Sequence, residues 1–161
     1  MCVHGRRAVL LGRSLAVALL ASACTRHPDT PDAQVRTLLA RAEVAAEGKD
    51  AAALKPLIAD AYRDELGQDK RAVMALLVYT FMHHESIHLL TRIHSVEFPQ
   101  PAHAEVVAFV AMAGQNLDRV ELLASLSADL YRFDFTLLDR GGGDWQVTRA
   151  RWHPATLDDF Q

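Results

Sequence analysis

The sequence has few cysteines and no strong excess of charge. Its only cysteines, Cys2 and Cys24, lie close to the N-terminus, and its formal net charge is −3. A mildly acidic chain has no electrostatic basis for binding a phosphate backbone, so we expect no nucleic-acid partner. The chain also lacks internal repeats and low-complexity tracts. Its N-terminal apolar run is too short for a comfortable transmembrane span, which needs about 20 residues.

What the N-terminus does contain is the pattern of a bacterial export leader. Three arginines form a basic start, residues 14–23 are apolar, and small residues directly precede Cys24. This stretch resembles a lipobox, which implies a signal peptide over residues 1–23 and acylation of Cys24, with palmitate among the acyl groups. The alternatives are an ordinary signal peptide cut elsewhere and an N-terminal membrane anchor.

Cleavage before Cys24 would change the properties of the chain. It would leave 138 of the 161 residues, which suits one domain with one core. It would also remove three arginines and no acid, so the formal charge would fall from −3 to −6. Cys2 would be lost and Cys24 lipidated, which leaves no internal disulfide. We expect a tether over residues 24–31, a domain over 32–154 and a tail over 155–161.

Three helices are predicted in the first half of this domain. The first begins at the cap residue Thr30 and closes near Gly48, and its apolar residues recur on one face. A shorter helix begins at Asp50, with a kink or restart at Pro56 because proline has no backbone N–H. The third begins at Asp69 and has apolar residues around most of its circumference, so we expect it to be broadly buried.

The second half is rich in β-forming residues. Tyr131, Phe133 and Phe135 alternate with polar residues, which is typical of a half-buried strand, and a glycine run before Trp145 supplies a reversal. Helices followed by long strands indicate an α+β domain with helices on one side of a curved antiparallel sheet. A helical insertion is expected over 117–126, and strands are expected over residues 89–98, 103–112, 128–138 and 145–152.

The order of these elements resembles the nuclear transport factor 2-like, or SnoaL-like, superfamily. The resemblance is carried by the helices over 35–46, 50–62 and 69–84, and above all by the closing segment 143–152, which reads Gly-Asp-Trp-Gln-Val-Thr-Arg-Ala-Arg-Trp. It implies a cone with three N-terminal helices packed on a mostly antiparallel sheet of four long strands, around one pocket. The superfamily contains isomerases, dehydratases, cyclases, transport factors and binding domains, so the resemblance implies no particular reaction and no catalytic residue.

One motif suggests different chemistry. His84, Glu85 and His88 fit the zinc-binding pattern H-E-x-x-H, and His94 lies where metzincins place a third ligand. On a helix the two histidines would share one face, and Glu85 would activate water. Against this, Thr91 stands where metzincins need a glycine, and residues 89–98 have the pattern of a strand. The zinc hydrolase is therefore kept as an alternative only.

Five polar residues are candidates for the pocket. Arg132 and Asp134 alternate with the aromatic stripe, and we favour a solvated face for them. If that face is instead concave, they line the pocket together with His88, Arg92 and His94, which come from the strand over 89–98 and its start.

The function expected from the sequence is binding rather than catalysis. We expect a lipid-anchored protein of the bacterial cell envelope that faces the periplasm from the outer membrane, because Thr25 provides no signal for inner-membrane retention. It would bind a small ligand of apolar or mixed character without a cofactor, and form a homodimer through the open sheet face. The alternatives are an isomerase or dehydratase and the zinc hydrolase.

Overall fold

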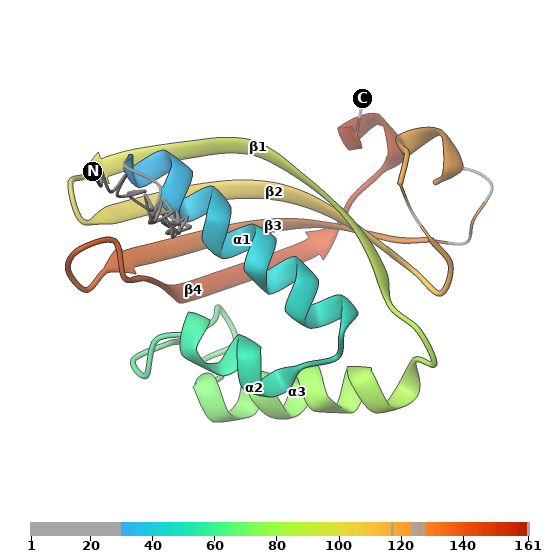
Figure 1. Ribbon diagram of the computed structural model, residues 1–161, viewed down its shortest axis with the longest axis horizontal. Helices are drawn as coiled ribbons and strands as arrows, with labels where there is room; N and C mark the ends of the chain where they lie inside the picture. Colours follow the sequence, from blue (N-terminus) through green and yellow to red (C-terminus); the bar gives the residue numbers. More distant parts are fainter. Residues whose placement is uncertain (1–29, 117, 124–125, 127, 161) are drawn as a thin grey trace, which may run out of the picture.

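The computed structural model describes residues 30–160 apart from 117, 124–125 and 127 (Figure 1). The predicted signal peptide, Cys24 and most of the predicted tether lie outside the described residues. Three helices are followed by a four-stranded antiparallel sheet, which confirms the predicted α+β class. No helix in the described part is long and apolar enough to span a membrane. The elements are α1 (Pro31–Glu47), α2 (Ala51–Leu54), η1 (Lys55–Leu57), α3 (Lys70–His83), β1 (His88–Gln100), β2 (His103–Ala113), η2 (Val120–Leu122), β3 (Asp129–Asp139), β4 (Trp145–Pro154) and η3 (Leu157–Phe160).

The helices begin at the predicted cap residues. The side chains of Thr30, Asp50 and Asp69 each accept a hydrogen bond from the backbone N–H three residues later, at 3.2, 2.9 and 2.9 Å. These bonds satisfy N–H groups that have no partner inside the helix. The second helix changes into the 3₁₀ turn η1 at Lys55, one residue before Pro56, which confirms the predicted restart. The predicted helical insertion is realised, within its described residues, as the 3₁₀ turn η2.

The strands form a meander in the order β1-β2-β3-β4, and the two faces of the sheet differ in character. The helical face, which α1 crosses in Figure 1, carries alternating apolar side chains such as those of Val106, Phe135 and Ala150. The outer face carries the intervening residues, including Glu105 and Asp134. This separation follows from the period of two along each strand. Irregularities in register between Ile93 and Ser95, and next to Leu137, change the alternation locally.

Part of each edge of the sheet is covered by another segment. At the β1 edge, the carboxylate of Glu47 on α1 accepts a hydrogen bond from the backbone N–H of Leu89 at 2.9 Å. At the β4 edge, the chain after η1 runs beside the strand, and the N–H of Ala59 donates to the carbonyl of Val147 at 2.9 Å. Covering the edges satisfies backbone groups that would otherwise be open to pairing with another chain.

The larger core cluster lies between the helices and the helical face. Trp145, which is 4% exposed, ties the closing strand to the first helix because its indole N–H donates to the Gln34 side-chain oxygen at 3.0 Å. Its ring also meets the ring of Phe98 edge-on, with centroids 5.8 Å apart. Trp145, in the closing segment 143–152, therefore joins β4 to α1 by a hydrogen bond and by packing in the core.

A smaller cluster lies on the outer face, around Phe109, Ala111 and Phe160. Phe160 is fully buried, and its carbonyl oxygen accepts a hydrogen bond from the guanidinium of Arg92. Residues 157–160, assigned from the sequence to a C-terminal tail, thus form the turn η3 and pack against the sheet. The packed domain extends to Phe160.

Candidate functional site

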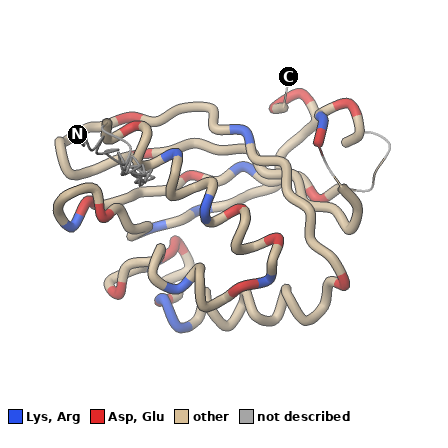
Figure 2. Tube along the Cα trace, in the orientation of Figure 1, with Lys and Arg blue, Asp and Glu red and all other residues tan. Residues whose placement is uncertain are grey.

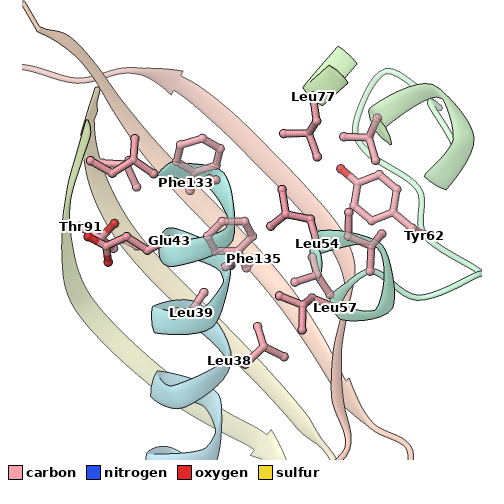
Figure 3. A pocket seen from close by; sticks show the side chains of 18 residues that line it. Leu38, Leu39, Glu43, Leu54, Leu57, Tyr62, Leu77, Thr91, Phe133 and Phe135 are labelled. Atoms are coloured by element: carbon pink, nitrogen blue, oxygen red, sulfur yellow. The ribbon is translucent and has the colours of Figure 1, made fainter. Parts of the chain in front are cut away.

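An apolar cavity of about 240 Å³ lies between α1 and the helical face of the sheet (Figure 3). Small side chains on facing walls leave this room: Ala42 and Ala46 on α1, and Ala108 on β2. Phe133 and Phe135 of β3 form the aromatic floor, and the remaining walls come from α2, η1, α3 and β1. Because almost the whole lining is apolar, the cavity suits an apolar molecule.

Among the described residues, one carboxylate lines this cavity. Glu43 of α1 is half-buried and accepts hydrogen bonds from the side chain and the backbone N–H of Thr91 on β1. Burial raises the pKa of Glu43 above its usual value of 4.5, and the neighbouring charge of Glu47 adds to this, although the bonds from Thr91 oppose it. Glu43 thus has two roles: it covers the edge of β1 and it places an ionisable group at the cavity wall.

The second polar group is the hydroxyl of Tyr62, in the segment between η1 and α3. The residue is 1% exposed, and burial raises the pKa of its phenol to about 12, with the charge of Asp64 contributing. The backbone of Ala150 partly offsets that shift, yet no described atom completes a hydrogen bond of regular geometry with the hydroxyl. A buried hydroxyl without a full partner costs stability, so a bound ligand that accepts its proton would gain affinity.

We predict that Glu43→Gln changes the pH dependence of stability. A carboxyl whose pKa is higher in the folded state binds protons more tightly when folded, so it weakens the fold as the pH rises past 4.5 and through the raised pKa. Glutamine keeps an acceptor for Thr91 but does not titrate. The free energy of unfolding in urea should therefore shift in favour of Glu43→Gln between about pH 4 and about pH 7. Glu97→Gln serves as the control, because Glu97 is an exposed carboxylate on the outer face. Equal pH profiles for wild type and Glu43→Gln would contradict the prediction.

The five residues considered for the pocket do not line this cavity. Leu89 and Thr91 of β1 face it, so His88 and Arg92 project to the other side of the sheet. There Arg92 contacts the carbonyl of Phe160, and His94 packs edge-on against Phe109 with ring centroids 5.8 Å apart.

On β3, Arg132 and Asp134 pair with each other on the outer face, where guanidinium nitrogen and carboxylate oxygen are 2.9 Å apart. This is the solvated-face arrangement, because the aromatic stripe of β3 faces the helices. Asp134 also borders a polar depression of about 300 Å³ on the outer face, together with Glu97, Glu105, Arg149 and Arg151. These residues therefore lie away from the apolar cavity, and Asp134 remains a candidate for a separate polar site on the outer face.

The helical geometry required for a zinc site at His84 and His88 does not form. Helix α3 ends at His83, the backbone of His84 is extended (φ −112°, ψ 128°), and His88 begins β1. Ile87, which is buried, draws the connection into the core, and the Lys49 ammonium donates to the carbonyls of His84 and Glu85 at 3.0 and 2.9 Å. Within the described residues, no group of three His, Cys, Asp or Glu side chains could hold a metal ion. The described residues therefore do not support a zinc hydrolase.

Comparison with known proteins defines the fold. No protein-family model matches the sequence, and no curated protein does. Solved structures match well, each at low identity. A provisionally assigned scytalone dehydratase from Novosphingobium aromaticivorans has a TM-score of 0.64 at 10% identity, over 78% of this chain and 84% of that one.

Two further structures support the same fold. A domain of unknown function with a cystatin-like fold from Nostoc punctiforme has a TM-score of 0.61 at 12% identity, over 81% of this chain and 85% of that one. A nuclear transport factor 2-like protein of unknown function from Shewanella oneidensis has a TM-score of 0.57 at 14% identity, over 76% of this chain and 98% of that one. The chain therefore has the nuclear transport factor 2-like fold, as the sequence resemblance implied. Such identities establish the fold and no activity.

Proposed function

We propose that this chain is a lipid-anchored protein of the bacterial cell envelope whose domain binds one small, largely apolar molecule. The observation that carries the proposal is the cavity beneath α1, with its nearly continuous apolar lining. An apolar ligand that fills a cavity with so largely apolar a lining gains free energy, because its apolar surface leaves water. The cavity lies below the usual range for drug-sized ligands, about 300–1,000 Å³, so the ligand is small.

The polar side chains of the lining define the ligand further. An apolar body would lie over Phe133 and Phe135, while one polar end would reach either Tyr62 or the pair formed by Glu43 and Thr91. A hydroxyl or carbonyl oxygen at that end would accept the proton of the Tyr62 phenol, for which the described residues supply no acceptor. The ligand class is therefore a small apolar molecule with one hydrogen-bonding group.

A second candidate function is proton transfer on such a ligand. Glu43 combines a raised pKa with a place in an apolar cavity, which are properties of a general base or acid. An isomerase or dehydratase would use it in that way. Turnover separates the two functions: an enzyme that uses Glu43 converts its ligand and loses that turnover in Glu43→Gln, whereas a binding protein releases its ligand unchanged.

The proposed anchor rests on the leader pattern that ends at Cys24. Acylation of that cysteine would hold the domain at the membrane surface by a short tether, with the outer membrane as the proposed site and the periplasm as the proposed compartment. Stable anchoring by lipid requires more than one acyl chain, because a single chain gives only marginal binding.

Mass spectrometry of the full chain purified from a bacterial envelope fraction tests both parts. Under denaturing conditions, we expect a chain that begins at Cys24 and carries added acyl mass, and Cys24→Ser should lack that mass. Under native conditions, one further bound molecule per chain is expected. An uncleaved, unacylated chain would contradict the anchor. A chain that stays free of bound mass after incubation with an envelope lipid extract would contradict the binding function.

A further inference from the structure

The outward side of α3 is an apolar surface that nothing in the described chain covers. Residues 72–82 contain no charged side chain. Four large apolar residues on this helix are strongly exposed: Leu76 at 42%, Val78 at 41%, Tyr79 at 56% and Met82 at 72%. Helix α3 lies at the margin of the molecule in Figure 1, and in Figure 2 charged positions mark only its N-terminal end. The sequence predicted broad burial, and the structure covers only the inner side.

The exposed residues form one continuous stripe. Leu76, Tyr79 and Met82 recur every three residues and so project from the same side of the helix, with Val78 beside them. The opposite side carries Phe81, which is buried in the core, and Leu77, which lines the cavity. A helix that is apolar all round is stable only if its outer side, like its inner side, lies in an apolar environment.

The acids nearest to α3 do not break this stripe. Asp69 is engaged as the N-terminal cap through the N–H of Ala72. Asp60 pairs with Lys70 at 2.9 Å, at the start of the helix. The charged and capping residues thus lie at the N-terminal end of α3. Residues 72–82, which follow them, carry no charge whose burial would oppose contact with lipid.

The size of the stripe argues against a second copy of the chain as its partner. The four exposed residues present an area on the order of 400 Å², which is in the range of functional patches on monomers. A stable protein interface buries about 800 Å² on each partner and has a polar rim with hydrogen bonds. A bilayer needs no such complementarity, and an amphipathic side chain such as Tyr79 suits the headgroup level.

We propose that α3 lies flat on the surface of a lipid bilayer, with Leu76, Tyr79 and Met82 inserted at the boundary of headgroups and acyl chains. This docking stands apart from the lipid on Cys24 and from ligand binding. One consequence rests on the proposed function: because Leu77 and Val73 of the same helix line the cavity, docking would place the cavity wall next to the source of apolar ligands.

Hydroxyl-radical footprinting of the full chain, with and without phosphatidylcholine–phosphatidylglycerol vesicles, tests the docking. Met82 is the reporter, since an exposed methionine oxidises readily to the sulfoxide. On vesicles, the oxidation rate of Met82 should fall about fivefold or more, because the inserted side chain leaves water. His153, exposed on the outer face, should keep its rate.

The double variant Leu76→Glu/Tyr79→Glu should lose the protection of Met82, because two carboxylates oppose insertion. Val44→Glu is the matched control, since Val44 is 70% exposed on α1 and should not affect docking. An unchanged Met82 rate in the wild type on vesicles would overturn the proposal, whether or not the double variant folds. Protection of Met82 that depends on protein concentration without vesicles would also overturn it, because it would indicate a second copy of the chain on α3.

Discussion

Replacing Trp145 with alanine is expected to destabilise the domain by about 3–5 kcal/mol, the range for large aromatic side chains lost from a core. Three losses combine at this residue. The side chain is 4% exposed, its indole N–H bonds Gln34 of α1, and its ring packs against Phe98 of β1. The substitution therefore leaves a cavity and removes the hydrogen bond that joins β4 to α1. Chemical denaturation followed by circular dichroism measures the effect.

Trp152→Ala provides the comparison for this prediction. Trp152 is the other tryptophan of β4, but it is only partly buried, and its main aromatic neighbour is Phe133 with ring centroids 6.3 Å apart. Its removal should cost less than half as much, because less apolar area leaves the core. If both variants lose the same free energy, Trp145 has no special role in joining the sheet to α1.

Filling the cavity should abolish most ligand binding without harming the fold. Ala42 lines the cavity from α1 and is only partly buried, so Ala42→Phe can project its ring into the vacant space. The affinity for N-phenyl-1-naphthylamine, a neutral apolar probe, should fall more than about tenfold, which corresponds to 1.4 kcal/mol. The free energy of unfolding should stay level or rise, because cavity filling is a common route to stabilisation.

Ala40→Phe is the matched control for the filled cavity. It makes the same substitution on the same helix, but Ala40 is exposed and does not line the cavity. It should bind the probe like the wild type. Equal losses in the two variants would show that the probe binds the surface of α1, whereas full affinity in Ala42→Phe would place the site elsewhere.

The fold could be predicted because its signals are local. Thr30, Asp50 and Asp69 each cap a helix with their own side chains, and the alternation along residues 131–137 and the glycine-rich reversal define the closing hairpin. Each of these features depends on neighbours a few residues away. The order of the elements then restricts the topology, since consecutive long strands favour a meander.

The cavity could not be located in this way, because alternation shows that a strand has two faces but not which face is concave. The aromatic stripe of β3 faces the helices, so the intervening Arg132 and Asp134 project to the outer face. On β1, the irregularity between Ile93 and Ser95 changes the alternation, and no glycine or proline marks it in the sequence.

Glu43 and Tyr62 were missed for different reasons. Glu43 lies next to Leu39 and Ala42 on the apolar side of α1, so an acid beside an apolar stripe was the available signal. In the sequence, Glu43 cannot be told from a charged residue at the border of the apolar side of a surface helix. Its burial becomes visible only when the structure places it against Thr91. Tyr62 lies in an irregular segment, and its burial depends on contacts with strands far along the chain.

The exposure of one side of α3 could not be predicted from the sequence either. Its composition predicts a helix with apolar neighbours on every side, and the fold supplies them on one side only. The match to H-E-x-x-H failed at the same place, because the helix ends one residue before His84. No proline or glycine between residues 84 and 87 announces that end.

The most direct test of the account is a fluorescence titration of the wild-type chain with N-phenyl-1-naphthylamine. The cavity predicts saturable binding with one site per chain and displacement by small apolar molecules that carry a single hydroxyl or carbonyl group. A folded chain that shows no saturable binding, or binding that such molecules do not displace, would contradict the claim that this domain holds a ligand beneath α1.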